Sequence, residues 1–402
     1  MMLPIAIIGG GVIGLSIGWH LTRCGAQVCL FEKGLVGCEA SSAAAGMITP
    51  VSEVRWGEED LTQLFLESLR AYPTFVKEIE SASRLSTDFQ TTGSLMIAID
   101  HDDEAELNRL FEYQRELGLT VDWLNPSRIT ELEPLLTHQC VAGISSREEC
   151  FLDNNRLVLA LKEAFIKGGG KLFENRRVSA VEIEGQKLKA IRVTPSPGLR
   201  PPSPSPALSK VEGRGEGEEW MTISQLVLAT GIHTKIEGLP DKMVLPIRPV
   251  KGQALEVKNT QPLSLKRAIR TIHRYPVYLV PRSDGRIVVG ATSEEMGLDD
   301  KVTAGAILDL LYGAWKVLPT VYDMELLSTW TGHRPTSIDH SPILGRSGVD
   351  GLFVAMGMYR HGILLTPIVG KLMAELIAKE KDSKFFDVFG YKRFKIPPTP
   401  LC

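Results

Sequence analysis

A glycine-rich turn directly after a short apolar run constrains the fold of this chain more than any other feature. Residues 5–8 read as a buried strand, and Gly9, Gly11 and Gly14 follow with the spacing G-x-G-x-x-G at the start of an apolar helical pattern. In a dinucleotide-binding βαβ unit, one such glycine makes the tight turn and another lets backbone N–H groups approach the pyrophosphate. The third brings helix and strand close together. The pattern therefore predicts a dinucleotide at the first turn of a helix that begins with Val12 and Ile13.

An acidic residue at the end of the next apolar run supports this interpretation. Residues 27–31 form a second strand-like run that ends in Glu32, 18 positions after Gly14. A carboxylate at this place accepts hydrogen bonds from the adenosine ribose hydroxyls. Because it also disfavours a 2′-phosphate, FAD or NAD is expected rather than NADP.

Length and composition indicate a soluble protein of two domains. The chain has 402 residues, 44% of them hydrophobic and 23% charged, with a net charge of −3. This balance gives no reason to expect nucleic acid or an anionic membrane as a partner, and no stretch approaches the roughly 18 apolar residues of a membrane span. The six cysteines form no C-x-x-C pair, so we expect reduced thiols in a cytoplasmic protein, without a disulfide framework or a metal site.

Helical and strand-like patterns alternate along the chain, as in an α/β fold. The helical patterns lie at 60–83, 102–118, 153–167 (with Asp153 as N-cap), 303–318 and 363–378. The strand-like runs lie at 91–98, 171–174, 178–193, 223–228, 253–257, 276–281, 286–291 and 352–357, with short pieces at 119–145 and an extended stretch at 325–346.

Residues 195–218 interrupt the pattern with Pro, Ser, Gly and charged residues. Such a segment cannot bury a core. It is interpreted as an idle insertion at a hairpin tip, since long surface loops carry only a small closure cost. A proline-motif ligand for a partner domain is the alternative.

Several longer motifs together resemble a known family. They are the small-residue run Ser41 to Met47, the strand end Ala229-Thr230-Gly231, and the segments 278–282, 289–292, 332–335 and 359–364. On these motifs the chain resembles the D-amino-acid-oxidase superfamily of FAD-dependent oxidoreductases, and within it the glycine oxidases of the thiamine pathway. The resemblance covers nearly the whole chain outside the insertion.

This resemblance implies a two-domain α/β fold. A glutathione-reductase-like Rossmann domain for FAD would comprise 1–85, 150–235 and 325–385. A substrate domain with a mixed, largely antiparallel sheet would comprise 86–149 and 236–324, and 386–402 would form a C-terminal tail. FAD should be bound noncovalently, because no cysteine lies near residues 342–345.

The motifs and the resemblance together assign a set of contacts to FAD. These are Gly9, Gly11, Val12, Ile13, Gly14, Glu32, Lys33, Ala40, Ser41, Ala45, Gly46, Met47, Val178, Thr230, Gly231, Met358, Arg360, His361, Gly362, Ile363 and Leu364. Ser41 would bind the pyrophosphate and the backbone of Val178 the adenine. The turn at 360–364 would place helix N–H groups at the edge of the flavin that becomes negative on reduction.

Four residues are expected to surround the substrate. Arg334 has the guanidinium geometry for a carboxylate, Tyr278 would donate to the same carboxylate, and Met47 and Arg360 would line the rest of the pocket. The alternatives are a surface ion pair for Arg334, a strand tyrosine, a core methionine, and a phosphate or structural role for Arg360. In this superfamily the α-hydrogen leaves as hydride and no side-chain base is needed, so His361 is expected to pack against the cofactor.

The activity implied is oxidative deamination of glycine, sarcosine and small D-amino acids to the imine or 2-oxo acid, ammonia and hydrogen peroxide, with molecular oxygen as second substrate. The imine would supply thiamine thiazole synthesis, and the enzyme would be a homo-oligomer, up to a tetramer. Pro276, where the family's bacterial glycine oxidases have a histidine, and the stretch 293–296 leave the substrate preference open. A D-amino-acid dehydrogenase that reduces a quinone and a non-catalytic flavoprotein subunit are the alternatives.

Overall fold

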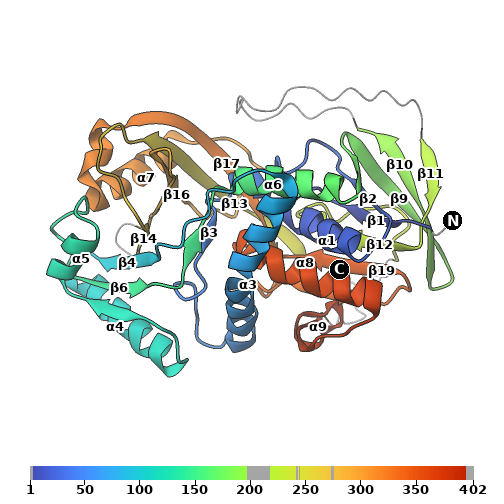
Figure 1. Cartoon of the computed structure of the whole chain (residues 1–402), viewed down its shortest axis with the longest axis horizontal. Helices are drawn as coiled ribbons and strands as arrows, with labels where there is room; N and C mark the ends of the chain where they lie inside the picture. The colour runs from blue at the N-terminus through green and yellow to red at the C-terminus, as the bar shows by residue number, and fades with distance from the viewer. Residues whose placement is uncertain (1–2, 197–217, 241–242, 244, 273–275, 395–402) are drawn as a thin grey trace, which may run out of the picture.

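The computed structural model describes residues 3–196, 218–240, 243, 245–272 and 276–394. Most of the insertion predicted at 195–218 and the end of the tail predicted at 386–402 lie outside these residues. Two large sheets, one at each end of the molecule, dominate the architecture (Figure 1).

The first sheet has six strands and carries the glycine-rich turn. Its order is β18 (Ile343–Arg346), β19 (Leu352–Met356), β12 (Gln225–Leu228), β1 (Ile5–Ile8), β2 (Val28–Phe31) and β8 (Lys171–Phe173). Its strand pairs are parallel except for the antiparallel pair β18–β19. Strand β1 is buried along its whole length, which explains why its sequence is a continuous apolar run.

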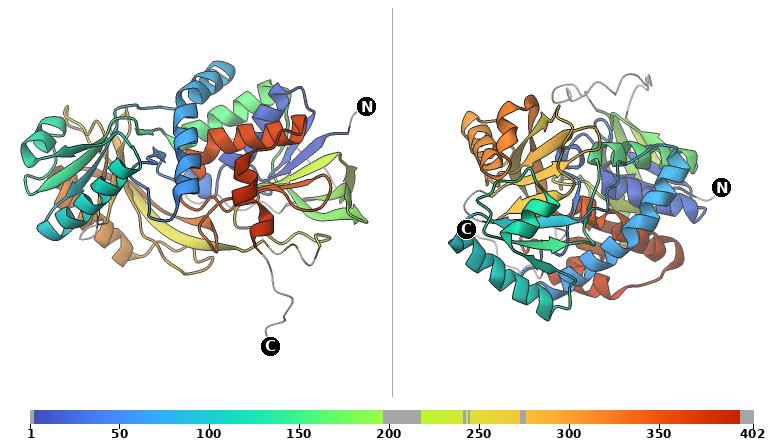
Figure 2. Two further views of the ribbon diagram at one scale, coloured as in Figure 1. Left: turned by 90° about the horizontal axis from the view of Figure 1, so that it is seen from below. Right: turned by 60° about the vertical axis from the view of Figure 1, so that its left-hand side comes forward.

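Different elements cover the two faces of this sheet. Ile5 and Ile7 share a core with four helices, α1 (Val12–Arg23), α3 (Glu59–Ser83), α6 (Asn154–Lys167) and α8 (Gly362–Lys379). Ala6 and Ile8 point the other way. They pack against the antiparallel sheet of β9 (Arg176–Glu184), β10 (Lys187–Pro195) and β11 (Glu219–Thr222). Figure 2 shows the helices gathered on one side.

The second sheet has eight strands. Its order is β17 (Glu325–Ser337), β13 (Ile247–Lys258), β16 (Arg286–Gly290), β15 (Tyr278–Pro281), β14 (Ala268–Thr271), β4 (Ser94–Ala98), β6 (Ala142–Ser146) and β5 (Asp122–Leu124). The pair β14–β4 is parallel, and the other pairs are antiparallel. The prediction of a mixed, largely antiparallel sheet is therefore confirmed.

Helices cover both faces of the second sheet as well. Leu95 and Ile97 of β4 pack with α5 (Pro126–Leu132) and α7 (Ala304–Val317). Met96 and Ala98 face α4 (His101–Glu116). The remaining short elements are α2 (Ala40–Ala43), β3 (Met47–Ile48), β7 (Cys150–Phe151), the turn Pro319–Asp323, α9 (Lys384–Phe389) and the turn Tyr391–Arg393.

Several elements of the structure were not predicted from the sequence. The stretch 119–145 contains the expected strand pieces, β5 and the start of β6, and between them helix α5, which was not predicted. Asn125 caps this helix by accepting from Arg128 N at 2.9 Å, with Pro126 next, a start signal that the strand interpretation overlooked. Strand β14 was not predicted, because its residues Ala268 to Thr271 form neither a continuous apolar run like β1 nor an alternating pattern.

Strand β17 lies in the second sheet, paired with β13, although the expected domain bounds assign 325–337 to the FAD-binding part. The domain bounds themselves stay a prediction. The N-cap of α6 is confirmed: Asp153 accepts from Asn155 N at 3.0 Å and Arg156 N at 3.1 Å.

Candidate active site

A cavity of about 860 Å³ runs from the first turn of α1 to the strands of the second sheet. Every residue predicted to contact cofactor or substrate lines it except Gly14. Residues far apart in the sequence, on β1, the 40–47 segment, β15, β17 and the start of α8, thus meet around one space.

The glycine-rich turn has the geometry that the sequence predicted. Gly9 has φ +110°, and a Cβ there would lie 2.2 Å from Ala229 O. A Cβ on Gly14 would lie 2.0 Å from Gly9 O, so Gly14 serves helix–strand packing and stands behind the cavity wall. At the helix start, Val12 N donates to Ser41 Oγ at 3.1 Å. A Cβ on Gly11 would lie 3.1 Å from the same Ser41 Oγ, and the cavity is lined here by Gly11 and Val12, so a ligand meets backbone at the N-terminus of α1, as a pyrophosphate requires.

Glu32 is fixed at the end of β2. Its two carboxylate oxygens accept from Gly10 N at 2.8 Å and Gly34 N at 2.9 Å. Burial raises the pKa of Glu32, and these two N–H groups act against the shift. The carboxylate is therefore held in one orientation at the cavity wall.

A small charged cluster lies beside Glu32. Lys33 pairs with Glu39 at 2.6 Å, and His233 Nε2 lies 3.1 Å from the same Glu39 oxygen. Burial opposes ionisation of Glu39, but the hydrogen bonds from His233 and Lys33 lower its pKa to about 2. Lys33 was predicted from the sequence, whereas Glu39 and His233 were not, since a lone acid and a lone histidine carry no signal.

The segment 40–47 is held by its backbone carbonyls. Asn154 Nδ2 donates to Ser41 O at 2.9 Å and to Ser42 O at 3.0 Å. Trp330 Nε1 donates to Ala43 O at 3.1 Å, and Arg282 Nη2 donates to Ala45 O at 2.8 Å. Leu152 N donates to Gly46 O at 3.0 Å. The donors come from both parts of the molecule, so the segment has a fixed position between them.

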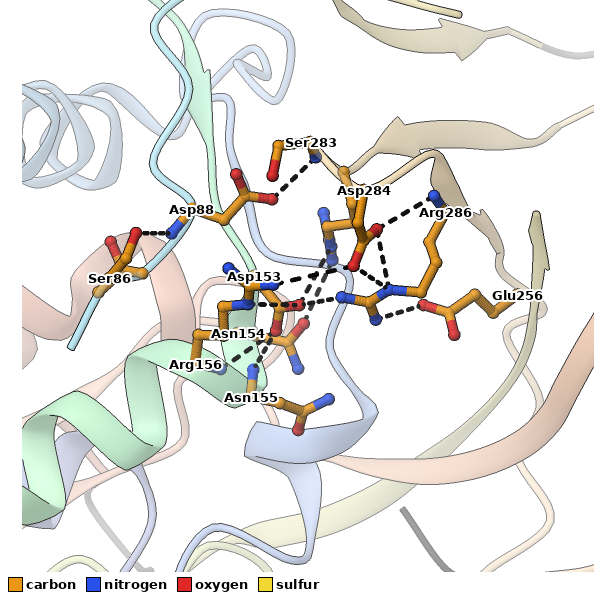
Figure 3. A network of polar contacts seen from close by, with 12 residues as sticks. Ser86, Asp88, Asp153, Asn154, Asn155, Arg156, Glu256, Ser283, Asp284 and Arg286 are labelled. Carbon is orange, nitrogen blue, oxygen red and sulfur yellow. Dashed lines mark hydrogen bonds and ion pairs between the residues drawn. The ribbon is translucent and has the colours of Figure 1, made fainter. Parts of the chain in front are cut away.

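A network of ion pairs supports these donors (Figure 3). Asp153 pairs with Arg286 at 2.8 Å, and Arg286 pairs with Glu256 at 2.9 Å and with Asp284 at 2.8 Å. Arg282 Nε lies 3.9 Å from Oδ2 of Asp153. The network joins the β15–β16 hairpin to the start of α6 and so connects the two large sheets.

Arg334 and Tyr278 share one end of the cavity. Arg334 Nη1 donates to Lys251 O at 3.2 Å, and the guanidinium lies over Gly252, where a Cβ would be 2.5 Å from Nη1 and Nη2. Similarly, a Cβ on Gly290 would lie 2.3 Å from the Tyr278 hydroxyl. A glycine inside a strand indicates such a close approach, so Gly252 and Gly290 could have been predicted from the sequence as positions that make room for another side chain.

The protonation states of this end follow from burial. Burial raises the pKa of Tyr278, so its hydroxyl is a donor at neutral pH. Burial lowers the pKa of Arg334, an effect that the nearby Tyr278 opposes; an arginine remains charged all the same.

The turn before α8 brings the last predicted residues to the cavity. Gly362, Ile363 and Leu364 form the first turn of the helix, beside Met358. The His361 ring packs on Phe65 with centroids 4.3 Å apart, and burial lowers the pKa of His361 to about 4. The exposed Arg360 places its guanidinium 4.9 Å from the Tyr359 ring centroid.

Two cavity residues, Glu53 and Arg270, were missed by the sequence analysis. They form an ion pair, and Arg270 of β14 lies directly opposite Tyr278 of β15. No local pattern marks either residue, since only the sheet pairing brings Arg270 to this place.

The residues present fit FAD. The backbone surface at α1 suits a pyrophosphate, Glu32 suits a ribose, and the N-terminus of α8 offers a second set of N–H groups at the same cavity. Within the described ranges no group of three or more His, Cys, Asp or Glu side chains could hold a metal ion. In the same part of the chain no helix is both long and apolar enough to span a membrane.

Comparisons with known proteins agree with this fit. The sequence model of the family described as FAD dependent oxidoreductase matches residues 4–376. A glycine oxidase of Geobacillus kaustophilus is 31% identical over 379 residues, 94% of this chain and 93% of the relative. A bifunctional protein ThiO/ThiG of Trichormus variabilis is 30% identical over 98% of this chain, which spans 56% of that protein.

Solved structures show the same similarity. The crystal structure of glycine oxidase from Geobacillus kaustophilus matches with a TM-score of 0.85 and 29% identity, over 98% of this chain and 99% of that one. The structure of glycine oxidase from Bacillus cereus matches with a TM-score of 0.83 and 27% identity, over 96% and 97%. The chain therefore belongs to the family of FAD dependent oxidoreductases and is an enzyme that uses FAD.

Proposed function

We propose that this enzyme oxidises glycine and related small amines, such as sarcosine and small D-amino acids, to the imine or 2-oxo acid and ammonia, with hydrogen peroxide formed from oxygen. The observation that carries the proposal is the half-buried guanidinium of Arg334 beside the Tyr278 hydroxyl, at the end of the cavity away from α1. The similarity to glycine oxidases supports it.

Arg334 and Tyr278 would bind the substrate carboxylate. Because Nη1 of Arg334 is engaged by Lys251 O, the Nε–Nη2 edge remains for two parallel N–H···O bonds. Tyr278, protonated at neutral pH, adds an O–H donor from β15, which lies two strands beyond β13, the partner of the Arg334 strand β17. Together they fix the carboxylate and so the direction of the α-carbon.

Other groups would set the environment of the reacting carbon. FAD, when bound, supplies the two-electron acceptor for the α-hydrogen. The N-terminal N–H groups of α8 favour negative charge beside them. His361, with a pKa of about 4, is a weak base at neutral pH, and Met47 and Arg360 line the remaining wall. We therefore propose a substrate that enters with a neutral amine and needs no side-chain base.

We further propose that FAD is bound noncovalently. Cys38, the cysteine that lines the described cavity, lies near Glu39 and Glu32 at the α1 end, away from the substrate end where a flavin ring would react. The similarity to ThiO/ThiG proteins supports a role in supplying the glycine imine for thiamine thiazole synthesis. A cytoplasmic homo-oligomer, up to a tetramer, completes the proposal.

The test is a substrate screen of the FAD-loaded enzyme with glycine, sarcosine, N-ethylglycine, D-alanine and D-proline. Peroxide formed in step with substrate loss supports an oxidase. Substrate loss without peroxide, with electrons recovered in an added quinone, would replace the oxidase by a dehydrogenase. No turnover of any of the five would refute the proposal.

A further inference from the structure

The substrate end of the cavity holds a carboxylate among its cations. Arg334, Arg270 and Arg360 all line the cavity, and Glu53 lies among them. Asp309, the other acid at this end within the described residues, belongs to an exposed position of α7. A carboxylate in the wall repels the carboxylate of a substrate, so the position of Glu53 must have another physical reason.

The position of Arg270 makes it a neighbour of the carboxylate-binding pair. Because Arg270 and Tyr278 are directly opposite on β14 and β15, their side chains project from the same face of the sheet. Arg270 would therefore offer a second guanidinium to any substrate bound at Tyr278. Instead it is paired with Glu53.

The loop that carries Glu53 is fixed by hydrogen bonds to a buried carboxylate. The fully buried Glu149 accepts from Ser52 N at 2.8 Å and from Ser52 Oγ at 2.7 Å. Ser52 O in turn lies 3.5 Å from Arg270 Nη1. The hydrogen bonds between Ser52 and the buried Glu149 therefore fix the position of the neighbouring Glu53 against Arg270.

Glu53 is charged where it lies. Burial acts to raise its pKa, but Arg270, His361 and Arg360 lower it overall. The pair is mostly withdrawn from water, with side-chain exposures of 25% for Arg270 and 16% for Glu53, so its charges are poorly screened. Arg334 has no carboxylate partner among the described residues and stays open to the substrate.

We propose that Glu53 is a specificity-determining residue that neutralises Arg270 and restricts the site to amino acids with one carboxylate. A substrate with a second carboxylate must displace Glu53 or accept its repulsion. This inference rests on the proposed function, because it assigns Arg334 to the first carboxylate.

The test compares binding of unreactive carboxylates to FAD-loaded Glu53→Gln, Arg270→Met and the double variant, followed by the flavin absorption spectrum. The ligands are acetate as monocarboxylate, and malonate and succinate as dicarboxylates of two lengths. Glu131→Gln is the matched control, since Glu131 forms an exposed ion pair with Arg128 on α5.

In Glu53→Gln the affinity for the better dicarboxylate, relative to acetate, should rise about 10-fold, because a charge-assisted hydrogen bond becomes available at Arg270. Arg270→Met, which leaves Glu53 without its partner, should lower the same ratio. The double variant should lie within about 3-fold of wild type. Iminodiacetate and D-aspartate, as substrates, should gain against glycine in Glu53→Gln alone.

A ratio that stays within about 2-fold of wild type in Glu53→Gln overturns the proposal, and so does an equal rise in the double variant. If Glu53→Gln fails to retain FAD, the opposite sign expected for Arg270→Met decides alone. Ligand binding needs no turnover. An enzyme inactive on glycine that still shows the predicted ratios would refute the proposed function and leave Glu53 as the determinant of carboxylate number.

Discussion

Replacement of Arg334 by alanine tests the centre of the proposed mechanism. With Nη1 engaged by Lys251 O at 3.2 Å, two donors remain for the substrate carboxylate, and each charge-assisted bond contributes about 1.5–3 kcal/mol. Arg334 is only half-buried, so water offsets part of this sum. We expect a loss of about 3 kcal/mol, or roughly 100-fold in kcat/KM for glycine.

The assay is steady-state oxidation of glycine together with acetate binding to the FAD-loaded variant. Arg334→Lys keeps the charge but loses the paired donors, so a loss of about 10-fold is expected. Arg128→Ala on the exposed face of α5 is the control. A kcat/KM of Arg334→Ala within about 3-fold of wild type, or unchanged acetate binding, would show that Arg334 does not bind the substrate carboxylate.

Three further predictions concern stability and the cofactor. Gly14→Ala places a Cβ 2.0 Å from Gly9 O, so it should lower the free energy of unfolding by about 1–3 kcal/mol and cause loss of FAD. Gly305→Ala, which has open space around it, should leave the free energy of unfolding unchanged. Thermal unfolding and the flavin content check both variants. Burial raises the pKa of Glu149 from 4.5 to about 6, so the folded state binds more protons than the unfolded state. The free energy of unfolding should therefore fall by about 2 kcal/mol as the pH rises from 4.5 to about 6. Glu149→Gln should remove this part of the pH dependence in thermal melts between about pH 4 and 8, and an unchanged pH dependence would contradict the prediction. Arg282→Met removes the donor to Ala45 O and a buried partner of Asp153, so the free energy of unfolding should fall by roughly 3 kcal/mol and FAD should bind more weakly. A FAD affinity equal to that of wild type would show that the position of the 40–47 segment does not depend on this bond.

Local patterns indicated the dinucleotide-binding turn and the elements around it. The turn at Gly9 to Gly14 and the acid at Glu32 lie within one βαβ unit, where spacing along the chain translates directly into geometry. Asp153 was found for the same reason, because an N-cap is defined by the next three residues. The helix at α5 carried the same kind of signal in Asn125 and Pro126.

The substrate side depended on contacts between distant strands. Arg334 was identified by resemblance, but Gly252, which makes room for its guanidinium, lies on a strand that pairs with β17. Arg270 and Glu53 were missed because 217 positions separate them and neither belongs to a local motif. Strand register decides which side chains share a face, and a sequence does not display the register of strands far apart.

The sequence by itself therefore determined that the cofactor is a dinucleotide, since a pyrophosphate is recognised through backbone at a local turn whose glycines are visible in the chain; the longer motifs at 41–47, 229–231 and 359–364 then indicated FAD. Only the tertiary structure decided the charge pattern of the substrate end. There, β14, β15, β17 and the loop of Glu53 converge, and the electrostatic balance of three arginines and one carboxylate depends on which of them are near enough to pair.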